Sequence, residues 1–165
     1  MKFDVVIIGG GVIGSAIAYF LSKEQANRIS VAVIEKDNSY QFGSTARSAG
    51  GIRQQFSTPE NIRISKFAVE FLRNVSEHLS IDGEKIDVSF TEQGYLFLAQ
   101  NHQIPILYNN NEVQKREDVP VVLLDPEDLK KTYPWMNTSD LAGGSMGLEG
   151  EGWLDAYGLN QAFRK

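Results

Sequence analysis

A glycine-rich turn at Gly9–Gly14 constrains the fold of this chain more than any other segment. The turn has the pattern Gly-x-Gly-x-x-Gly, and the segment Lys2–Ile8 before it is rich in Val and Ile without a breaker, which predicts a fully buried strand of the kind found in parallel sheets. After it, apolar residues recur every three or four positions from Val12 to about Lys23, which predicts a helix. The apolar run Ile29–Ile34 predicts a second buried strand. Strand, helix and strand within about 33 residues form a βαβ unit.

The glycines of this turn have separate roles in a dinucleotide-binding site. Gly9 permits the tight turn, Gly11 lets the backbone approach a pyrophosphate, and Gly14 lets the helix pack closely on the strand. The helix N-terminus then offers free N–H groups to the phosphates. Glu35 follows the second strand, where a carboxylate accepts hydrogen bonds from the adenosine ribose and repels the 2′-phosphate of NADP. These residues together predict dinucleotide binding, whereas a glycine turn without a ligand explains fewer of them.

The loop that follows, between Asn38 and Ser57, favours FAD over NAD. It leaves the βαβ unit near the carboxyl ends of the strands, where open α/β sheets place their ligands. Ser44 and Thr45 supply hydroxyl groups for phosphate or ribose, and Gly50-Gly51 allows the backbone to lie against a flat ring. A flexible hinge is the alternative interpretation of this composition. An NAD-dependent dehydrogenase, which would continue with further βα units, remains a lesser alternative.

The composition excludes several other classes of site. The net charge of −5 and the lack of a basic cluster argue against nucleic-acid binding. The absence of cysteine excludes disulfides and thiolate chemistry, and His78 and His102 alone make a metal site improbable. The uncharged run Val5–Leu21 is not interpreted as a signal peptide or membrane span, because Asp4 precedes it and three glycines interrupt it.

The remaining pattern predicts an α+β region. One long helix is expected from Pro59, capped by Thr58, with an apolar face of Ile64, Phe67, Ala68, Phe71, Leu72, Val75 and Leu79. The alternation of Ile86, Val88 and Phe90 predicts a strand, joined through Gln93-Gly94 to Tyr95–Ala99 as a hairpin. Residues 100–120 are expected to form a surface excursion with one short helix. Further expected elements are a strand at Val121–Leu124, a short helix after Asp125-Pro126, a loop or irregular strand over Gly143–Gly152, and a last helix from Ala156 capped by Asp155.

The predicted fold class is therefore α/β: a Rossmann-like FAD-binding βαβ domain followed by the beginning of an α+β substrate domain with antiparallel strands. The predicted division assigns residues 1–80 to dinucleotide binding, 81–142 to the start of the substrate domain, and 143–165 to a return segment with a final helix that carries no stop signal.

The glycine turn, Glu35 and the block Ser44–Ser57 resemble the FAD-dependent amine and amino-acid oxidoreductases that include D-amino-acid oxidase, sarcosine oxidase and dimethylglycine dehydrogenase. Within this family the match is closest to a subgroup linked to assembly of mitochondrial respiratory complex I, and to its bacterial relatives. Segments that fit this subgroup are Pro59–Asn61, Gly94–Leu96, Pro134–Thr138 and Glu151–Asp155. Because family members continue far beyond residue 165, the chain is expected to be an N-terminal fragment.

The resemblance implies oxidation of a C–N bond of an amine or N-substituted amino acid by hydride transfer to FAD. Arg53 matches the arginine that holds the substrate carboxylate in sarcosine oxidases, although an ordinary ion pair is an equally good interpretation of an arginine. Dimethylglycine dehydrogenases attach the flavin through a histidine where this chain has Arg47, so that linkage is impossible here. The cofactor-binding set expected from motif and resemblance is Gly9, Gly11, Val12, Ile13, Gly14, Glu35, Lys36, Ser44, Thr45, Arg47, Ser48, Gly50, Gly51 and Ile52.

Partners and location follow from the same resemblance. The expected partners are a small amine or amino-acid substrate and a respiratory-complex or electron-transfer protein. An FAD-binding assembly or scaffold protein with incidental turnover is the main alternative function. The lack of an Arg-rich, acid-poor leader favours a cytoplasmic location, with the mitochondrial matrix as the alternative.

Overall fold

The computed structural model describes residues 2–25 and 28–165 and divides them into two compact units. The first unit contains the described residues within 1–50, 74–89 and 154–165, and the second contains residues 51–73 and 90–153. Among the described residues, no helix combines the length and apolar character needed to cross a bilayer.

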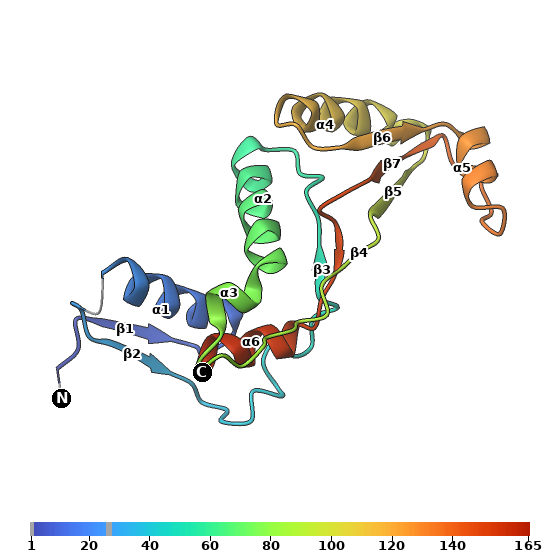
Figure 1. The fold of residues 1–165 in the computed structure, drawn as a ribbon. Helices are drawn as coiled ribbons and strands as arrows, with labels where there is room; N and C mark the ends of the chain where they lie inside the picture. The colour runs from blue at the N-terminus through green and yellow to red at the C-terminus, as the bar shows by residue number, and fades with distance from the viewer. Residues whose placement is uncertain (1, 26–27) are drawn as a thin grey trace. The chain divides into compact units, whose positions relative to one another are not determined.

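The first unit is built on the predicted βαβ motif (Figure 1). Strands β1 (Val5–Ile8) and β2 (Val31–Ile34) pair in parallel and flank helix α1 (Val12–Glu24), which confirms the predicted elements with slightly shorter strands. Helix α3 (Val75–Leu79) and helix α6 (Ala156–Arg164) complete the unit, and α6 packs against α1. The predicted cap of α6 is confirmed, because the Asp155 carboxylate accepts a hydrogen bond from the Gly158 N–H.

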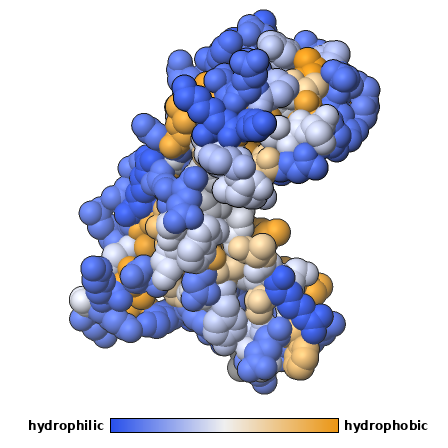
Figure 2. Space-filling view, turned by 90° about the vertical axis from the view of Figure 1, so that its right-hand side faces the viewer, coloured by the Kyte–Doolittle hydropathy of each residue, from blue (hydrophilic) through white to orange (hydrophobic). Residues whose placement is uncertain are grey.

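The prediction that β1 and β2 are fully buried is wrong. Side chains alternate across a strand, and Ile7 points toward α1 at Gly14 while its neighbours point to the other face. Val6 is 53% exposed and Ile8 is 88% exposed, since the described residues of this unit cover one face of the two-stranded sheet. Hydrophobic residues are also visible among hydrophilic ones on the face drawn in Figure 2.

The second unit contains two small antiparallel sheets. In the first, β8 (Gly152–Trp153) lies between β3 (Gly51–Ile52) and β4 (Thr91–Glu92). In the second, β7 (Gly143–Gly147) lies between β5 (Tyr95–Ala99) and β6 (Val121–Leu124). The helices are α2 (Pro59–Arg73), the short 3-10 helix η1 (Asn101–Gln103), α4 (Ile104–Arg116) and α5 (Pro126–Thr132).

Several predicted elements differ from the observed ones. The long helix after Thr58 stops at Arg73, and Asn74 begins the separate helix α3 by accepting the Glu77 N–H at its carbonyl. On α2, Ile64 and Phe67 are exposed, and the buried residues are Ile62, Val69, Phe71 and Leu72.

The predicted hairpin is wrong. Residues 86–90 form no strand, although Ile86 and Val88 are buried. Strand β5 pairs with β7 rather than with the segment before it, because Gln93 and Gly94 both donate their N–H groups to the carbonyl of Glu151. The turn therefore leads from one sheet into the other.

The region expected to be a surface excursion contains the 13-residue helix α4, and the expected loop at 143–152 contains the central strand β7. The glycines of β7 leave room for both neighbouring helices. A Cβ at Gly144 would lie 3.1 Å from Leu129 of α5, and one at Gly143 would lie 3.3 Å from Ile104 of α4. Glycine is unusual inside a strand, and here it permits this close approach.

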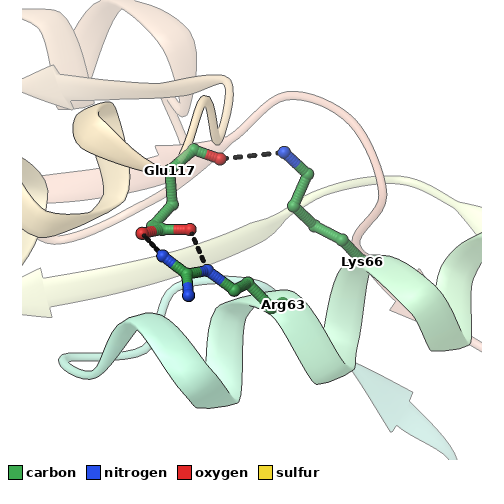
Figure 3. A network of polar contacts seen from close by, with 3 residues as sticks. All are labelled: Arg63, Lys66 and Glu117. Atoms are coloured by element: carbon green, nitrogen blue, oxygen red, sulfur yellow. Dashed lines mark hydrogen bonds and ion pairs between the residues drawn. The ribbon is translucent and has the colours of Figure 1, made fainter.

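A polar cluster on α2 joins this helix to the end of α4 (Figure 3). The Arg63 guanidinium donates two hydrogen bonds, of 2.8 and 2.7 Å, to the Glu117 carboxylate. Lys66, one turn further along, donates to the backbone carbonyl of Glu117 at 2.8 Å. The planar guanidinium fork matches the carboxylate geometry, so the cluster fixes the position of α4 next to α2.

Candidate functional site

The glycine turn between β1 and α1 has the geometry that the motif predicts. Gly9 has φ of 101° and donates its N–H to the carbonyl of Ile34 at 2.8 Å, which ties the turn to the end of β2. A Cβ at Gly14 would overlap the carbonyl oxygen of Gly9, so only glycine lets the helix approach this closely. Helix α1 begins at Val12, within this turn, with Gly11 as its N-cap.

Glu35 lies at the carboxyl end of β2 and contacts the glycine turn. Its Oε2 accepts the Gly10 N–H at 2.8 Å, and its Oε1 accepts the Asp37 N–H at 2.9 Å. The N–H groups of Asp37 and then Gly10 hold the pKa of Glu35 below its ordinary value. Each carboxylate oxygen retains a further lone pair, as ribose hydroxyl groups would require.

The loop after β2 returns to the N-terminus of α1 through Thr45. The hydroxyl of Thr45 accepts the N–H of Val12 at 3.0 Å, one of the first-turn N–H groups that have no partner within the helix. The Ser48 hydroxyl accepts the Gly50 N–H at 3.0 Å, and the Arg47 guanidinium lies 5.4 Å from the centre of the Phe42 ring.

The structure brings one part of the predicted cofactor set together in the first unit. This part extends from the glycine turn to the end of the Ser/Thr loop, whereas Gly51, Ile52 and Arg53 belong to the second unit. Within it, direct contacts join Gly10 to Glu35 and Val12 to Thr45, while the Ile13 side chain is 75% exposed. The residues of this part are Gly9, Gly11, Val12, Ile13, Gly14, Glu35, Lys36, Ser44, Thr45, Arg47, Ser48 and Gly50.

These residues fit the ADP half of FAD. The glycines of the turn let loop residues approach the helix N-terminus, since a Cβ at Gly11 would lie 3.2 Å from the Thr45 hydroxyl and one at Gly10 would lie 2.9 Å from the Tyr40 hydroxyl. The first-turn N–H groups and the hydroxyls of the loop suit a pyrophosphate, and the Glu35 carboxylate suits a ribose.

In the second unit, Arg53 lines an open groove of about 520 Å³. Its guanidinium carbon lies 5.0 Å from the centre of the Phe56 ring and 5.4 Å from that of Phe97. Tyr95, Asn61, Ser65 and Ile64 also line the groove. Aromatic rings attract a guanidinium but leave its N–H groups free to bind an anion.

A buried polar network in the second unit is formed by Glu151, Gln55 and Ser145, for which the sequence predicts no role. Glu151 is fully buried and accepts the N–H groups of Gln54 and Gln55 at 2.6 and 2.9 Å. The side-chain amide of Gln55 donates to Glu151 at 2.8 Å and accepts from Ser145. In the sequence, Glu151 is marked by its place between Gly150 and Gly152 and as part of the segment Glu151–Asp155 that fits the subgroup, and neither feature signals its burial.

Acid is expected to destabilise the first unit through Glu35. Because the folded-state pKa of Glu35 is lowered, its contribution is fully present above the ordinary value of 4.5 and is lost as the pH falls through the folded value. We therefore expect urea unfolding to show that a Glu35→Gln variant is less stable than the unmodified protein above pH 4.5.

The difference between the two proteins should shrink as Glu35 becomes protonated. Asp4 also has a lowered pKa, from its bonds to Ser30, and it changes both proteins equally. Asp37, whose pKa is lowered first by Ser39, interacts with the charge of Glu35, so both proteins carry Asp37→Asn in this comparison. A constant difference at all pH values would contradict the assignment to Glu35.

Comparison with known proteins identifies the family. The model of the family described as "FAD dependent oxidoreductase" matches residues 4–165. The chain is 49% identical over 167 residues to FAD-dependent oxidoreductase domain-containing protein 1 of Xenopus laevis, covering 99% of this chain and 34% of that protein. It is 31% identical over 140 residues to the sarcosine oxidase subunit beta of Arthrobacter sp, covering 84% of this chain and 33% of that protein.

The fold is shared with a solved relative. The crystal structure of L-proline dehydrogenase from P. horikoshii matches with a TM-score of 0.79 at 34% identity, covering 98% of this chain and 40% of that chain. The chain thus spans about a third of the length of the curated relatives that it matches. Both the predicted α/β fold class and the predicted cofactor, FAD, agree with this family. The family model covers nearly the whole chain, and the chain therefore belongs to the FAD-dependent oxidoreductases.

Proposed function

We propose that the whole protein oxidises the C–N bond of an N-substituted amino acid, with FAD as the electron acceptor. In this proposal the first unit binds the ADP half of FAD, and the second unit begins the substrate site. The backbone at Gly50 and Gly51 would approach the flavin ring. FAD, when bound, supplies a two-electron acceptor for the hydride released from the substrate carbon.

The observation that carries the proposal is the placement of Arg53. Its guanidinium lies beside Phe56 and Phe97 at an open groove, and it is exposed. An arginine restrained by aromatic rings can bind a carboxylate through two parallel hydrogen bonds, which fixes the orientation of the substrate. The apolar groove wall suits the substituents on nitrogen.

The names of two relatives support the substrate class. Sarcosine and proline, in the names of the Arthrobacter and P. horikoshii proteins, are both N-substituted amino acids with a free carboxylate. A substrate of this class releases hydride only when its amine is neutral. The carboxylate therefore provides the permanent charge by which Arg53 orients the molecule.

The test uses the full-length protein loaded with FAD under anaerobic conditions. We expect flavin reduction by a panel of N-methyl amino acids and little reduction by the corresponding amines without a carboxylate. Arg53→Gln should lower kcat/KM for the amino acids by about a hundredfold or more, because a carboxylate without its partner is costly to bind.

Arg63→Gln is the matched control, since Arg63 pairs with Glu117 and does not line the groove. An unchanged ratio of amino acid to amine turnover in Arg53→Gln would contradict the role of Arg53. A purified full-length protein without flavin would contradict the whole proposal.

The proposal includes a protein electron acceptor, such as a respiratory-complex partner, and a location in the cytoplasm or the mitochondrial matrix.

The panel of N-methyl amino acids also separates this enzyme from an FAD-binding assembly protein. An assembly protein with incidental turnover should retain FAD but show no reduction by any member of the panel.

A further inference from the structure

The peptide group that joins Arg53 to Gln54 is held by hydrogen bonds on both of its edges. Its carbonyl oxygen accepts a hydrogen bond from the Ser65 hydroxyl. Its N–H donates to Oε1 of Glu151 at 2.6 Å. A peptide group is planar, so two bonds on opposite edges fix its orientation. That orientation sets the direction in which the Arg53 side chain leaves the backbone.

Glu151 binds this segment through both carboxylate oxygens. Oε1 also accepts the Gln55 N–H at 2.9 Å, and Oε2 accepts the Gln55 side-chain amide at 2.8 Å. A fully buried carboxylate is costly unless hydrogen bonds replace its hydration, and here three N–H groups do so. Among the residues that the structure describes, no Lys or Arg forms an ion pair with Glu151.

The backbone of Glu151 is anchored beside the strand that carries the aromatic partner of Arg53. Its carbonyl accepts the N–H groups of Gln93 and Gly94 at 3.1 and 3.0 Å, directly before β5. Strand β5 contains Phe97, whose ring lies next to the Arg53 guanidinium. Glu151 thus fixes the backbone of the Arg53 segment and also the start of the strand against which the side chain packs.

We propose that Glu151 is a positioning residue that holds Arg53 in the orientation needed to bind the substrate carboxylate. The inference rests on the proposed function, because it assigns Glu151 a role only through Arg53. Glutamine would not replace Glu151 fully, since its NH₂ group would face the Gln55 side-chain amide in place of an acceptor. Ser65 supports the same peptide group from its other edge.

The experiment titrates the full-length, FAD-loaded protein with acetate and measures the change in flavin absorbance. Acetamide, an uncharged molecule of similar size, is titrated in parallel. We expect Glu151→Gln to weaken acetate binding about tenfold and to leave acetamide binding unchanged, because the lost acceptor releases the Arg53 peptide. Ser65→Ala should also weaken acetate binding, because it removes the hydrogen bond to the carbonyl on the other edge of that peptide group.

Glu117→Gln is the matched control, a carboxylate of the same unit that pairs with Arg63 (Figure 3). It should bind acetate like the unmodified protein. In the Arg53→Gln background, Glu151→Gln should add no further loss, because the residue through which it acts is already gone. If Glu151→Gln does not fold, Glu151→Asp replaces it in the same comparison, alone and combined with Arg53→Gln, because the shorter side chain draws the acceptor away from the Gln54 N–H.

The outcomes separate the two levels of the proposal. If Arg53→Gln leaves acetate affinity unchanged, the proposed function fails. If Arg53→Gln weakens acetate binding while Glu151→Gln and Ser65→Ala do not, the function stands and the positioning role is overturned. Equal losses for acetate and acetamide would also overturn it, since a purely structural role gives no selectivity for the charge.

Discussion

Replacing Gly14 with alanine is expected to abolish retention of FAD by the full-length protein. A Cβ at this buried position would overlap the carbonyl oxygen of Gly9 and lie 3.1 Å from its carbonyl carbon. Both atoms belong to the backbone of the turn, so no side chain can rotate to make room. The start of α1 must move away from β1, at a cost of about 3 kcal/mol.

The movement displaces the atoms that are expected to bind the pyrophosphate. The N–H of Val12 lies in the first turn of α1 and bonds to Thr45, so a shift of the helix also shifts the loop. Flavin absorbance relative to protein, measured after gel filtration, reports the retention of FAD. We expect almost none in the Gly14→Ala variant.

Gly43→Ala is the control for this prediction. Its Cβ would meet only the carbonyl oxygen of Tyr40, at an ordinary contact distance of 3.6 Å. This variant should keep its FAD. Full retention by Gly14→Ala would show that the close approach of helix and strand is dispensable for binding.

The glycine turn could be predicted from the sequence because its requirements are local. Positive φ at Gly9 and the close approach at Gly14 are set by residues within one βαβ unit. The cap at Asp155 is local for the same reason, since it bonds to an N–H three residues away. Such features depend on neighbours in the chain and not on the rest of the fold.

The predicted hairpin failed because its outcome depends on a distant residue. Turn residues at Gln93-Gly94 suggest a return of the chain, but both N–H groups bond to Glu151, more than fifty residues away. Strand β7 was missed for a related reason. Its glycines lower the strand propensity, and only the packing of Leu129 and Ile104 against them explains their presence.

The role of Glu151 could not be predicted either. Glu151 accepts hydrogen bonds from Gln54 and Gln55, which lie 97 and 96 residues earlier in the chain. Sequence shows a glutamate between two glycines, which reads equally well as an exposed turn. Its complete burial is a property of the assembled unit alone.

The second large effect is expected at Gly147, where alanine should strongly destabilise the second unit. A Cβ here would overlap the Glu151 carboxylate, which three N–H groups hold in place. Moving the carboxylate would leave buried N–H groups without an acceptor, so we expect a loss of about 3 kcal/mol or more in the free energy of unfolding. Urea unfolding measures this loss.

A double-mutant cycle identifies the carboxylate as the cause. Glu151→Ala is itself destabilising, but it removes the atoms that the new methyl group would strike. In that background the next nearest atom is the side-chain nitrogen of Gln55, at 3.1 Å, which can move. Gly147→Ala should therefore cost far less than in the unmodified protein, giving a coupling of about 2 kcal/mol between the two positions. Additive losses would place the strain in the backbone of β7, and the glycine would then be required by the sheet and not by Glu151.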